Sequence, residues 1–170
     1  REAMKQNLKN LLSSYPDMKC KIYLLHGDLT YAEMTSLYKN PKIKALINIA
    51  HGEGFGLPMF EATQYGLPVI TIGWSGQLDF LQIKGRNMFC VVDHDMGPIN
   101  PEAVWDGVLQ KNSLWAHPRQ ESYKKCLRNV FKNHKKYKKI ALELQDHVLE
   151  NFDESVIYPQ FVNAFLGYNV

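Results

Sequence analysis

The sequence has few cysteines, no long apolar run and no large excess of charge of either sign. Its three cysteines, Cys20, Cys90 and Cys126, are scattered, without a close pair or the spacing of a metal site. This pattern favours reduced thiols and a cytoplasmic location. Every apolar run is far shorter than the roughly 20 residues of a membrane span, so no transmembrane segment is expected.

The small net charge argues against one class of partner. The formal net charge is +3 over 170 residues, which gives no reason to expect nucleic-acid binding. Apolar residues make up 45% and charged residues 22%, as is ordinary for a globular protein. There is no signal-peptide pattern, repeat or low-complexity linker. The length therefore predicts a single domain over residues 1–170.

The most informative stretch is 51–61, which reads His-Gly-Glu-Gly-Phe-Gly-Leu-Pro-Met-Phe-Glu. It lies between two apolar runs, 45–50 and 68–72, that are suited to buried strands. A strand, a glycine-rich turn, a helix and a second strand form a βαβ unit. The helix would begin at Leu57, where free N–H groups and a partial positive charge suit a phosphate-bearing ligand.

Strands and helices alternate along the chain, which predicts an α/β fold with a Rossmann-like parallel sheet flanked by helices. Strands are expected over 21–25, 44–50, 68–73 and 88–92. Helices are expected over 2–13, 31–39, 57–65, 77–82, 101–111, 119–150 and 152–166. The C-terminal helices thus occupy about 119–166, with a break near Asn133, and Thr30 with Glu33 forms a capping-box pattern.

Three expected loops follow strands: 26–29, 51–55 and 73–79. Right-handed crossovers place such loops on one edge of a parallel sheet, where ligands bind, so the pattern predicts one pocket. Trp74, in the third loop, suits either ligand stacking or core packing. Trp105 and Trp115 are expected in the core.

Two carboxylates, Glu53 and Glu61, lie eight residues apart in the informative stretch. A carboxylate accepts two hydrogen bonds, so each can hold a vicinal diol of a sugar or a ribose. The glycines between them let the backbone approach a ligand closely. From the residues alone, a tight βα turn with two structural glutamates remains an alternative.

Three motifs occur in order: Glu53-Gly-Phe-Gly-Leu-Pro-x-x-Glu61, Gly66-Leu-Pro-Val-Ile70 and Ser75-Gly-x-x-Asp79. They resemble the donor-site signature of retaining glycosyltransferases of the GT-B fold, whose C-terminal Rossmann-like domain carries a Glu-x7-Glu motif. The resemblance covers about residues 22–95. It implies a donor-binding domain of hexosyltransferase type, which takes a UDP- or GDP-linked sugar without a cofactor or a metal.

The resemblance also implies roles for single residues. Glu53 would contact the donor sugar as the catalytic group, and Glu61 would bind the ribose hydroxyls. The remaining expected ligand-binding residues are His51, Gly54, Phe55, Gly56, Leu57, Ser75 and Gly76. Most relatives have Gly-Gly-x-x-Glu where this chain has Ser75-Gly76-x-x-Asp79, which weakens any role given to Ser75 and Asp79.

A whole GT-B enzyme has two Rossmann-like domains, and 170 residues are too few for both. The resemblance therefore implies an N-terminal acceptor domain, without which this chain would be inactive. The acceptor, whether glycan, lipid or protein, is not indicated. The lysine-rich stretch 124–139 is usually read as a solvated face, but it leaves a peripheral membrane contact open.

Two other kinds of function remain open. The chain can be a non-catalytic nucleotide-binding module, or the donor-binding subunit of a two-chain transferase. It can also be a structural α/β domain whose loop binds only a phosphate. Discrimination between a nucleotide and inorganic phosphate separates the last of these from the others.

Overall fold

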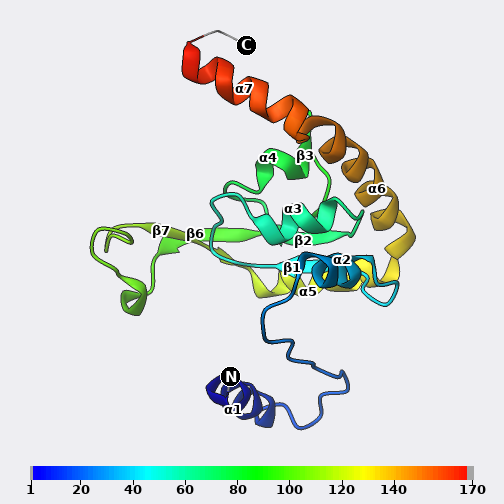
Figure 1. Cartoon of the computed structure of the whole chain (residues 1–170). Helices are drawn as coiled ribbons and strands as arrows, with labels where there is room; N and C mark the ends of the chain where they lie inside the picture. The colour runs from blue at the N-terminus through cyan, green and yellow to red at the C-terminus, as the bar shows by residue number, and fades with distance from the viewer. Residues whose placement is uncertain (1, 168–170) are drawn as a thin grey trace. The chain divides into compact units, whose positions relative to one another are not determined.

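The computed structural model describes residues 2–167 (Figure 1). The chain divides into two compact units, Arg1–Ser36 and Leu37–Val170. None of the described residues of the first unit is buried. That unit therefore has no core of its own, and the expectation of a single domain stays a prediction.

The first unit contains helix α1 (Glu2–Ser13) and most of helix α2 (Tyr31–Lys39), both as expected. The capping box at the start of α2 is confirmed. The backbone N–H and the hydroxyl of Thr30 each donate to Glu33 Oε2 at 2.8 Å. The N–H of Glu33 donates in return to Thr30 Oγ1 at 3.3 Å. These reciprocal bonds satisfy amide groups that a helix start leaves free.

The strand expected over 21–25 is wrong. The segment is irregular, and its apolar side chains are exposed, with Tyr23 at 83%. A strand satisfies its N–H and C=O groups through a neighbouring strand. The described part of the first unit offers no such neighbour. The predicted loop 26–29 consequently follows no strand of the structure.

A parallel sheet of three strands lies in the second unit, in the order β1 (Leu46–Asn48), β2 (Val69–Ile72) and β5 (Cys90–Val92). The central strand, β2, is buried along its whole length, as expected for a parallel strand covered on both faces. With helices on both faces (Figure 1), this arrangement confirms the α/β fold class.

Alternate residues of β2 face two separate cores. Val69 belongs to the core on the side of α3 (Leu57–Thr63) and α6 (His134–Asn151). Ile70 and Ile72 belong to the core on the side of α5 (Gln120–Lys132). This alternation follows from the two-residue period of a strand.

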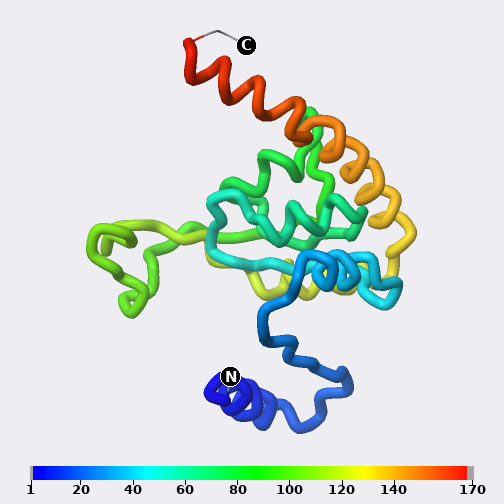
Figure 2. The backbone as a smooth tube through the Cα atoms, viewed as in Figure 1, coloured from blue at the N-terminus to red at the C-terminus, as the bar shows by residue number. Residues whose placement is uncertain are grey.

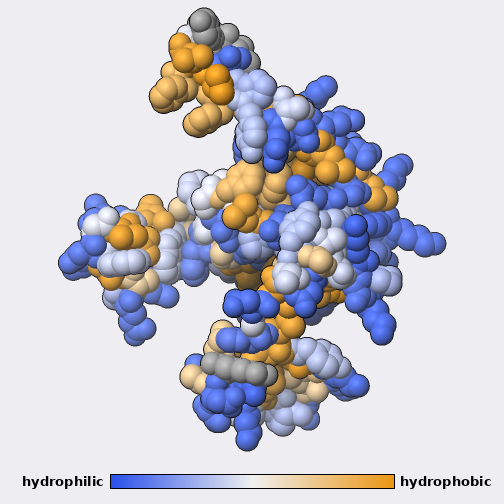
Figure 3. Space-filling view, in the orientation of Figure 1, coloured by the Kyte–Doolittle hydropathy of each residue, from blue (hydrophilic) through white to orange (hydrophobic). Residues whose placement is uncertain are grey.

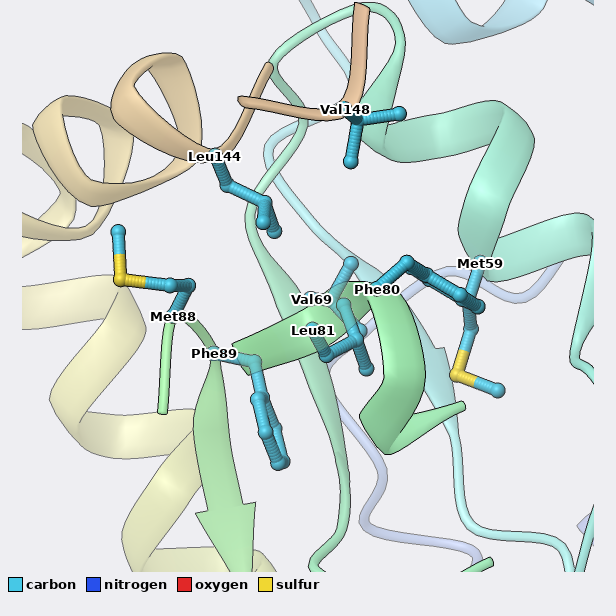
Figure 4. Packing of buried hydrophobic residues seen from close by; sticks show 8 residues of the cluster. All are labelled: Met59, Val69, Phe80, Leu81, Met88, Phe89, Leu144 and Val148. Carbon is cyan, nitrogen blue, oxygen red and sulfur yellow. The ribbon is translucent and has the colours of Figure 1, made fainter. Parts of the chain in front are cut away.

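Phe80 is fully buried in the core under α3. It lies in the short helix α4 (Leu78–Leu81), and its ring centroid is 5.0 Å from that of Phe55 and 5.2 Å from that of Phe60. Aromatic pairs at such distances add to the stability gained from burial. Figure 4 shows the buried side chains of this cluster converging: Met59, Val69, Phe80, Leu81, Met88, Phe89, Leu144 and Val148.

Helix α6 holds the C-terminal end of α3 in place. Lys138 Nζ donates to the Gly66 carbonyl and Gln145 Nε2 donates to the Gln64 carbonyl, both at 2.6 Å. These bonds satisfy backbone oxygens that a helix end leaves without partners. The predicted break between two C-terminal helices is confirmed, because α5 ends at Lys132 and α6 begins at His134.

The helix expected over 101–111 is wrong. Residues 94–118 form an antiparallel hairpin of β6 (His94–Pro98) and β7 (Leu114–Pro118), with a 3-10 turn at Pro101–Ala103. The hairpin continues from β5 beyond the parallel sheet (Figure 2). Near its tip, Trp105 and Leu109 exchange backbone hydrogen bonds around Gly107, which has a φ of 79°.

The physical reason lies in the Asp106-Gly107 pair, which is typical of a tight hairpin turn and unfavourable inside a helix. Trp105 is consequently 66% exposed, so the expectation of core packing is wrong for this residue. Small elements complete the second unit: the two-residue strands β3 (Gln82–Ile83) and β4 (Arg86–Asn87) pair with each other.

The last helix, α7 (Glu154–Leu166), is confirmed, and Asp153 caps it by accepting the N–H of Ser155 at 2.9 Å. It carries several exposed apolar side chains: Tyr158, Phe161, Val162, Phe165 and Leu166. Figure 3 shows orange, hydrophobic atoms near the end of this helix. None of the described helices combines the length and the apolar character needed to cross a membrane.

Candidate functional site

The loop after β1 and the loop after β2 are joined by hydrogen bonds. Ser75 Oγ accepts the N–H of Glu53 at 3.1 Å and donates to the Glu53 carbonyl at 2.7 Å. The N–H of Gly76 donates to the same carbonyl at 3.1 Å. The structure thus brings together three of the predicted site residues, from two motifs that are 22 positions apart in sequence.

The contact between these loops depends on close backbone packing. A Cβ added at Gly76 would lie 1.9 Å from the carbonyl oxygen of Gly54, so only glycine fits there. Ser75 has a φ of 78°, in the left-handed region that favours glycine. Its hydrogen bonds to Glu53 offset the cost of this conformation.

The side chain of Glu53 is oriented by Asn48, the last residue of β1. Asn48 Nδ2 donates to Glu53 Oε1 at 2.8 Å, while Asn48 Oδ1 accepts the N–H of Ala50 at 2.8 Å. This second bond fixes which way the amide faces. Sequence reasoning missed Asn48, although a polar residue at the end of an apolar strand was a usable signal.

One oxygen of Glu53 remains available. Among the described residues, Glu53 Oε2 has no hydrogen-bond partner within the protein. The structure records one buried and unpartnered side-chain polar atom in the described part of the chain, Gln77 Oε1. Glu53 Oε2 is unpartnered but is not a buried atom of this kind. It is therefore in contact with solvent and free to accept a hydrogen bond.

Glu61 lies on α3 and contacts Tyr38, from the end of α2. The Tyr38 hydroxyl is 3.2 Å from Glu61 Oε2 and donates to it. Burial, with a smaller contribution from the Glu61 charge, raises the pKa of Tyr38 to about 12, so the hydroxyl keeps its proton at neutral pH. The Tyr38 ring stacks on Tyr65 at 5.9 Å. Sequence reasoning missed Tyr38, because its contact joins positions 23 residues apart.

The backbone between the two carboxylates is held in one conformation. Gly56 caps α3 with a φ of 90°, and a Cβ there would lie 2.7 Å from Met59 Cε. Leu57 and Pro58 then form the first turn, with the Leu57 side chain exposed. Phe55 turns its ring into the core, 5.1 Å from Phe60. The Phe55 side chain is thus partly buried against this core.

His51 sits at the start of the same loop and contacts the hairpin. Its Nδ1 is 3.0 Å from the Ala116 carbonyl, and its ring stacks on Trp115 with centroids 4.5 Å apart and planes 5° apart. Trp115 is half-buried in this contact. Trp74 is 43% exposed, and its ring centroid lies 6.2 Å from that of His94.

The predicted site is a rim of loops. Four cavities of about 370 to 480 Å³ are lined by residues outside the predicted site. One of about 470 Å³ lies beside β1 and α5, where Ile47 and Leu127 are part of its wall. Within residues 2–167, no cluster of three His, Cys, Asp or Glu side chains is placed to hold a metal ion.

Three plant proteins are similar to this chain. Sucrose-phosphate synthase 4 of Arabidopsis thaliana is 31% identical over 123 residues, which cover 66% of this chain and 11% of that protein. In Oryza sativa subsp. japonica, probable sucrose-phosphate synthase 5 is 30% identical over 116 residues (64% of this chain, 11% of that protein). Probable sucrose-phosphate synthase 4 of the same plant is 32% identical over 110 residues (60% and 10%).

The chain thus spans about a tenth of the length of the curated relatives that it matches. No family model and no solved structure matches it. The similarities support a distant relationship to glycosyltransferases, which is the class that the three motifs indicate.

Proposed function

We propose that this chain is the donor-binding domain of a retaining glycosyltransferase of the GT-B fold. It would take a UDP- or GDP-linked hexose and pass the sugar to an acceptor. One observation carries the proposal: three hydrogen bonds join the Glu53 loop to the Ser75-Gly76 loop. The two loops follow adjacent parallel strands, at the edge of the sheet where α/β folds bind ligands.

Glu53 is the proposed sugar-binding group. Its free Oε2 can accept hydrogen bonds from sugar hydroxyls, while Asn48 holds Oε1. A sugar held in this way presents its anomeric carbon in a fixed direction, which lowers the entropic cost of reaction. Retention with front-face attack needs no covalent intermediate, so Glu53 binds and orients the sugar and is not a nucleophile.

Glu61 is proposed to bind the ribose. Tyr38 donates one hydrogen bond to Glu61 Oε2, which leaves acceptor capacity on both carboxylate oxygens. A vicinal diol offers two donors at the spacing of a carboxylate. Tyr38 then acts as a positioning residue, because it directs the carboxylate without contact to the nucleotide.

Backbone amides near the start of α3 are proposed to receive the diphosphate, namely those of Gly54, Phe55, Gly56 and Leu57. Fixed dipoles aimed at a developing negative charge stabilise a leaving diphosphate without reorganisation. Ser75 and Gly76 are proposed to support the loop and not to bind the diphosphate. Their polar groups are engaged by Glu53, so they shape the loop on which the ligand lies.

An N-terminal acceptor domain would complete the enzyme. The chain corresponds to about a tenth of the length of its relatives, which supports further domains in the whole protein. Closure of a donor site against a second domain would shield the bound sugar from water. The nature of the acceptor is left unassigned, and the proposed location is the cytoplasm.

A thermal-shift comparison of UDP-glucose, GDP-mannose, UDP and inorganic phosphate tests the proposal. A ligand that binds only the folded chain stabilises it by about 2.7 kcal/mol at a hundredfold excess over its dissociation constant. For a chain of this size, that corresponds to a rise in Tm of roughly 5 to 10 °C. We expect one nucleotide sugar to give such a shift and phosphate to give none.

The other outcomes separate the alternatives. Equal shifts with phosphate and with nucleotides would favour a structural domain with a phosphate site, and no shift with any ligand would contradict the proposal. A non-catalytic nucleotide-binding module would bind the same ligands. Sequencing the reading frame upstream of residue 1 distinguishes it, because a single-chain transferase requires an acceptor domain there.

A further inference from the structure

The β6–β7 hairpin contacts both the backbone and the ring of His51. The N–H of Ala116 donates to the His51 carbonyl at 3.3 Å. The Ala116 carbonyl in turn lies 3.0 Å from His51 Nδ1. A single residue of β7 therefore bonds to both the main chain and the side chain of His51, two positions before Glu53.

These bonds decide which ring nitrogen of His51 carries the hydrogen. A carbonyl oxygen only accepts, so Nδ1 must donate to it. In the neutral imidazole, Nε2 then keeps a lone pair and acts as an acceptor. Nε2 has no hydrogen-bond partner among the described residues. It is also not fully buried, because Gln77 Oε1 is the fully buried side-chain atom that lacks a partner in this part of the chain.

The plane of the His51 ring is also fixed. The Trp115 ring lies parallel to it at 4.5 Å, and the His117 ring meets it edge-on at 4.9 Å. His117 is itself held, because its Nε2 donates to the Pro98 carbonyl at 3.1 Å on the paired strand. A ring fixed by several contacts binds a ligand without the further entropic cost of ordering.

We propose that the hairpin is a specificity element of the donor site, which presents His51 Nε2 as an acceptor for a hydroxyl of the donor sugar. The inference rests on the proposed function. A carboxylate oxygen and the lone pair of Nε2 only accept hydrogen bonds, so neither can bond to an ionised phosphate oxygen. Two acceptors in one loop, two positions apart in sequence, favour the hydroxyl-rich end of a nucleotide sugar. They thereby set the direction in which the ligand lies.

Two substitutions separate the proposed role from a structural one. In His51→Asn, the amide nitrogen lies near the position of Nδ1 and can keep the bond to Ala116. In His51→Gln, the amide reaches the position of Nε2 and can accept from the sugar. Calorimetry would compare UDP-glucose and GDP-mannose with UDP and GDP on the whole chain.

Loss of one hydrogen bond predicts that His51→Asn binds the nucleotide sugar roughly 3- to 10-fold more weakly than the wild type. Its affinity for the nucleotide diphosphate should be unchanged. His51→Gln should lose less affinity for the sugar nucleotide than His51→Asn. A merely structural histidine predicts the reverse order, because Asn keeps the Ala116 bond and Gln does not.

Trp115 and His134 supply the controls. Trp115→Phe should keep the stack and the affinity, while Trp115→Ala should weaken sugar-nucleotide binding. His134 bonds to the Lys44 carbonyl in another part of the second unit, and His134→Asn should change neither affinity.

Three results would overturn the inference. In the first, His51→Asn binds the nucleotide sugar as tightly as the wild type does. In the second, His51→Asn loses affinity for the nucleotide sugar and the nucleotide diphosphate equally. In the third, the wild type binds no nucleotide sugar, and the proposed function then fails together with the inference. The first two results refute the inference and leave the proposed function standing.

Discussion

The hydroxyl of Ser75 bonds to both backbone polar groups of Glu53, accepting its N–H at 3.1 Å and donating to its carbonyl at 2.7 Å. One short side chain thereby fixes the main chain that carries the proposed sugar-binding carboxylate. Ser75 adopts a φ of 78° to reach this position. A strained residue whose strain is offset by bonds to a functional loop is common at binding sites.

Two substitutions of Ser75 should differ in their effect on stability. Ser75→Ala removes both bonds and retains the unfavourable φ, so we expect the free energy of unfolding to fall by about 2 kcal/mol. Ser75→Gly also removes the bonds but relieves the strain, so its loss should be smaller by about 1 kcal/mol. Urea unfolding measures both, and equal losses would contradict the strain assigned to Ser75.

Gly76 and Gly54 form a matched pair for the contact between the loops. A Cβ at Gly76 would meet the Gly54 carbonyl oxygen at 1.9 Å, whereas a Cβ at Gly54 would meet nothing within 4 Å. Gly76→Ala should therefore lower the free energy of unfolding by at least about 2 kcal/mol. Gly54→Ala should leave it nearly unchanged. Similar stabilities of the two variants in urea would show that the loops do not pack as described.

The pair of Tyr38 and Glu61 predicts a pH dependence of stability. The pKa of Tyr38 is raised from 10.0 to about 12 in the folded chain, so the unfolded chain releases this proton first. The stabilising contribution is complete below about pH 10 and is lost as the pH rises toward 12. Tyr38→Phe should reduce the fall in stability between about pH 9 and pH 11.

The same variant has a second effect at neutral pH. It removes one hydrogen bond to Glu61 and should cost about 1 kcal/mol. Urea unfolding curves across this pH range measure both effects. Tyr137, whose pKa is also raised to about 12, mainly by its hydrogen bond to Cys90, supplies Tyr137→Phe for comparison. An unchanged alkaline profile in Tyr38→Phe would contradict the proton linkage.

Phe80 and Phe131 test the position of the core. Phe80 is fully buried between α3 and the sheet, whereas Phe131 is 86% exposed on α5. Phe80→Ala should lower the free energy of unfolding by about 3 to 5 kcal/mol. Phe131→Ala should change it by less than about 0.5 kcal/mol. Thermal unfolding measures the difference, and a large effect of Phe131→Ala would show that α5 is covered by another surface.

Much of the fold could be predicted because its signals are local. The apolar runs before His51 and after Gly66, with a glycine-rich turn between them, predict the βαβ unit that the structure contains. The capping box at Thr30 and the break at Asn133 are likewise determined by a few neighbouring residues. Local hydrogen bonds decide such features.

The errors have different causes. The strand expected over 21–25 fails because apolar composition does not supply a neighbouring strand. The helix expected over 101–111 fails because the Asp106-Gly107 turn outweighs the helical spacing of nearby apolar residues. In both cases the prediction relied on the composition of one segment, whereas the structure is decided by whether a second strand pairs with it.

The candidate site was only partly predictable. The motifs identified its carboxylates and glycines, which lie close together in sequence. The partners that orient Glu61 and His51 come from elsewhere: Tyr38 from α2 and Ala116 from β7. Contacts between distant positions depend on the folded arrangement and leave no periodic pattern in the sequence.

Calorimetric titration of Glu53→Gln and Glu61→Gln tests the central claim most directly. The account predicts that Glu61→Gln binds both the nucleotide diphosphate and the nucleotide sugar roughly tenfold more weakly, since a charged hydrogen bond to the ribose is lost. Glu53→Gln should bind the nucleotide diphosphate as the wild type does and lose affinity only for the nucleotide sugar. Wild-type affinity of both variants for both ligands would contradict the account.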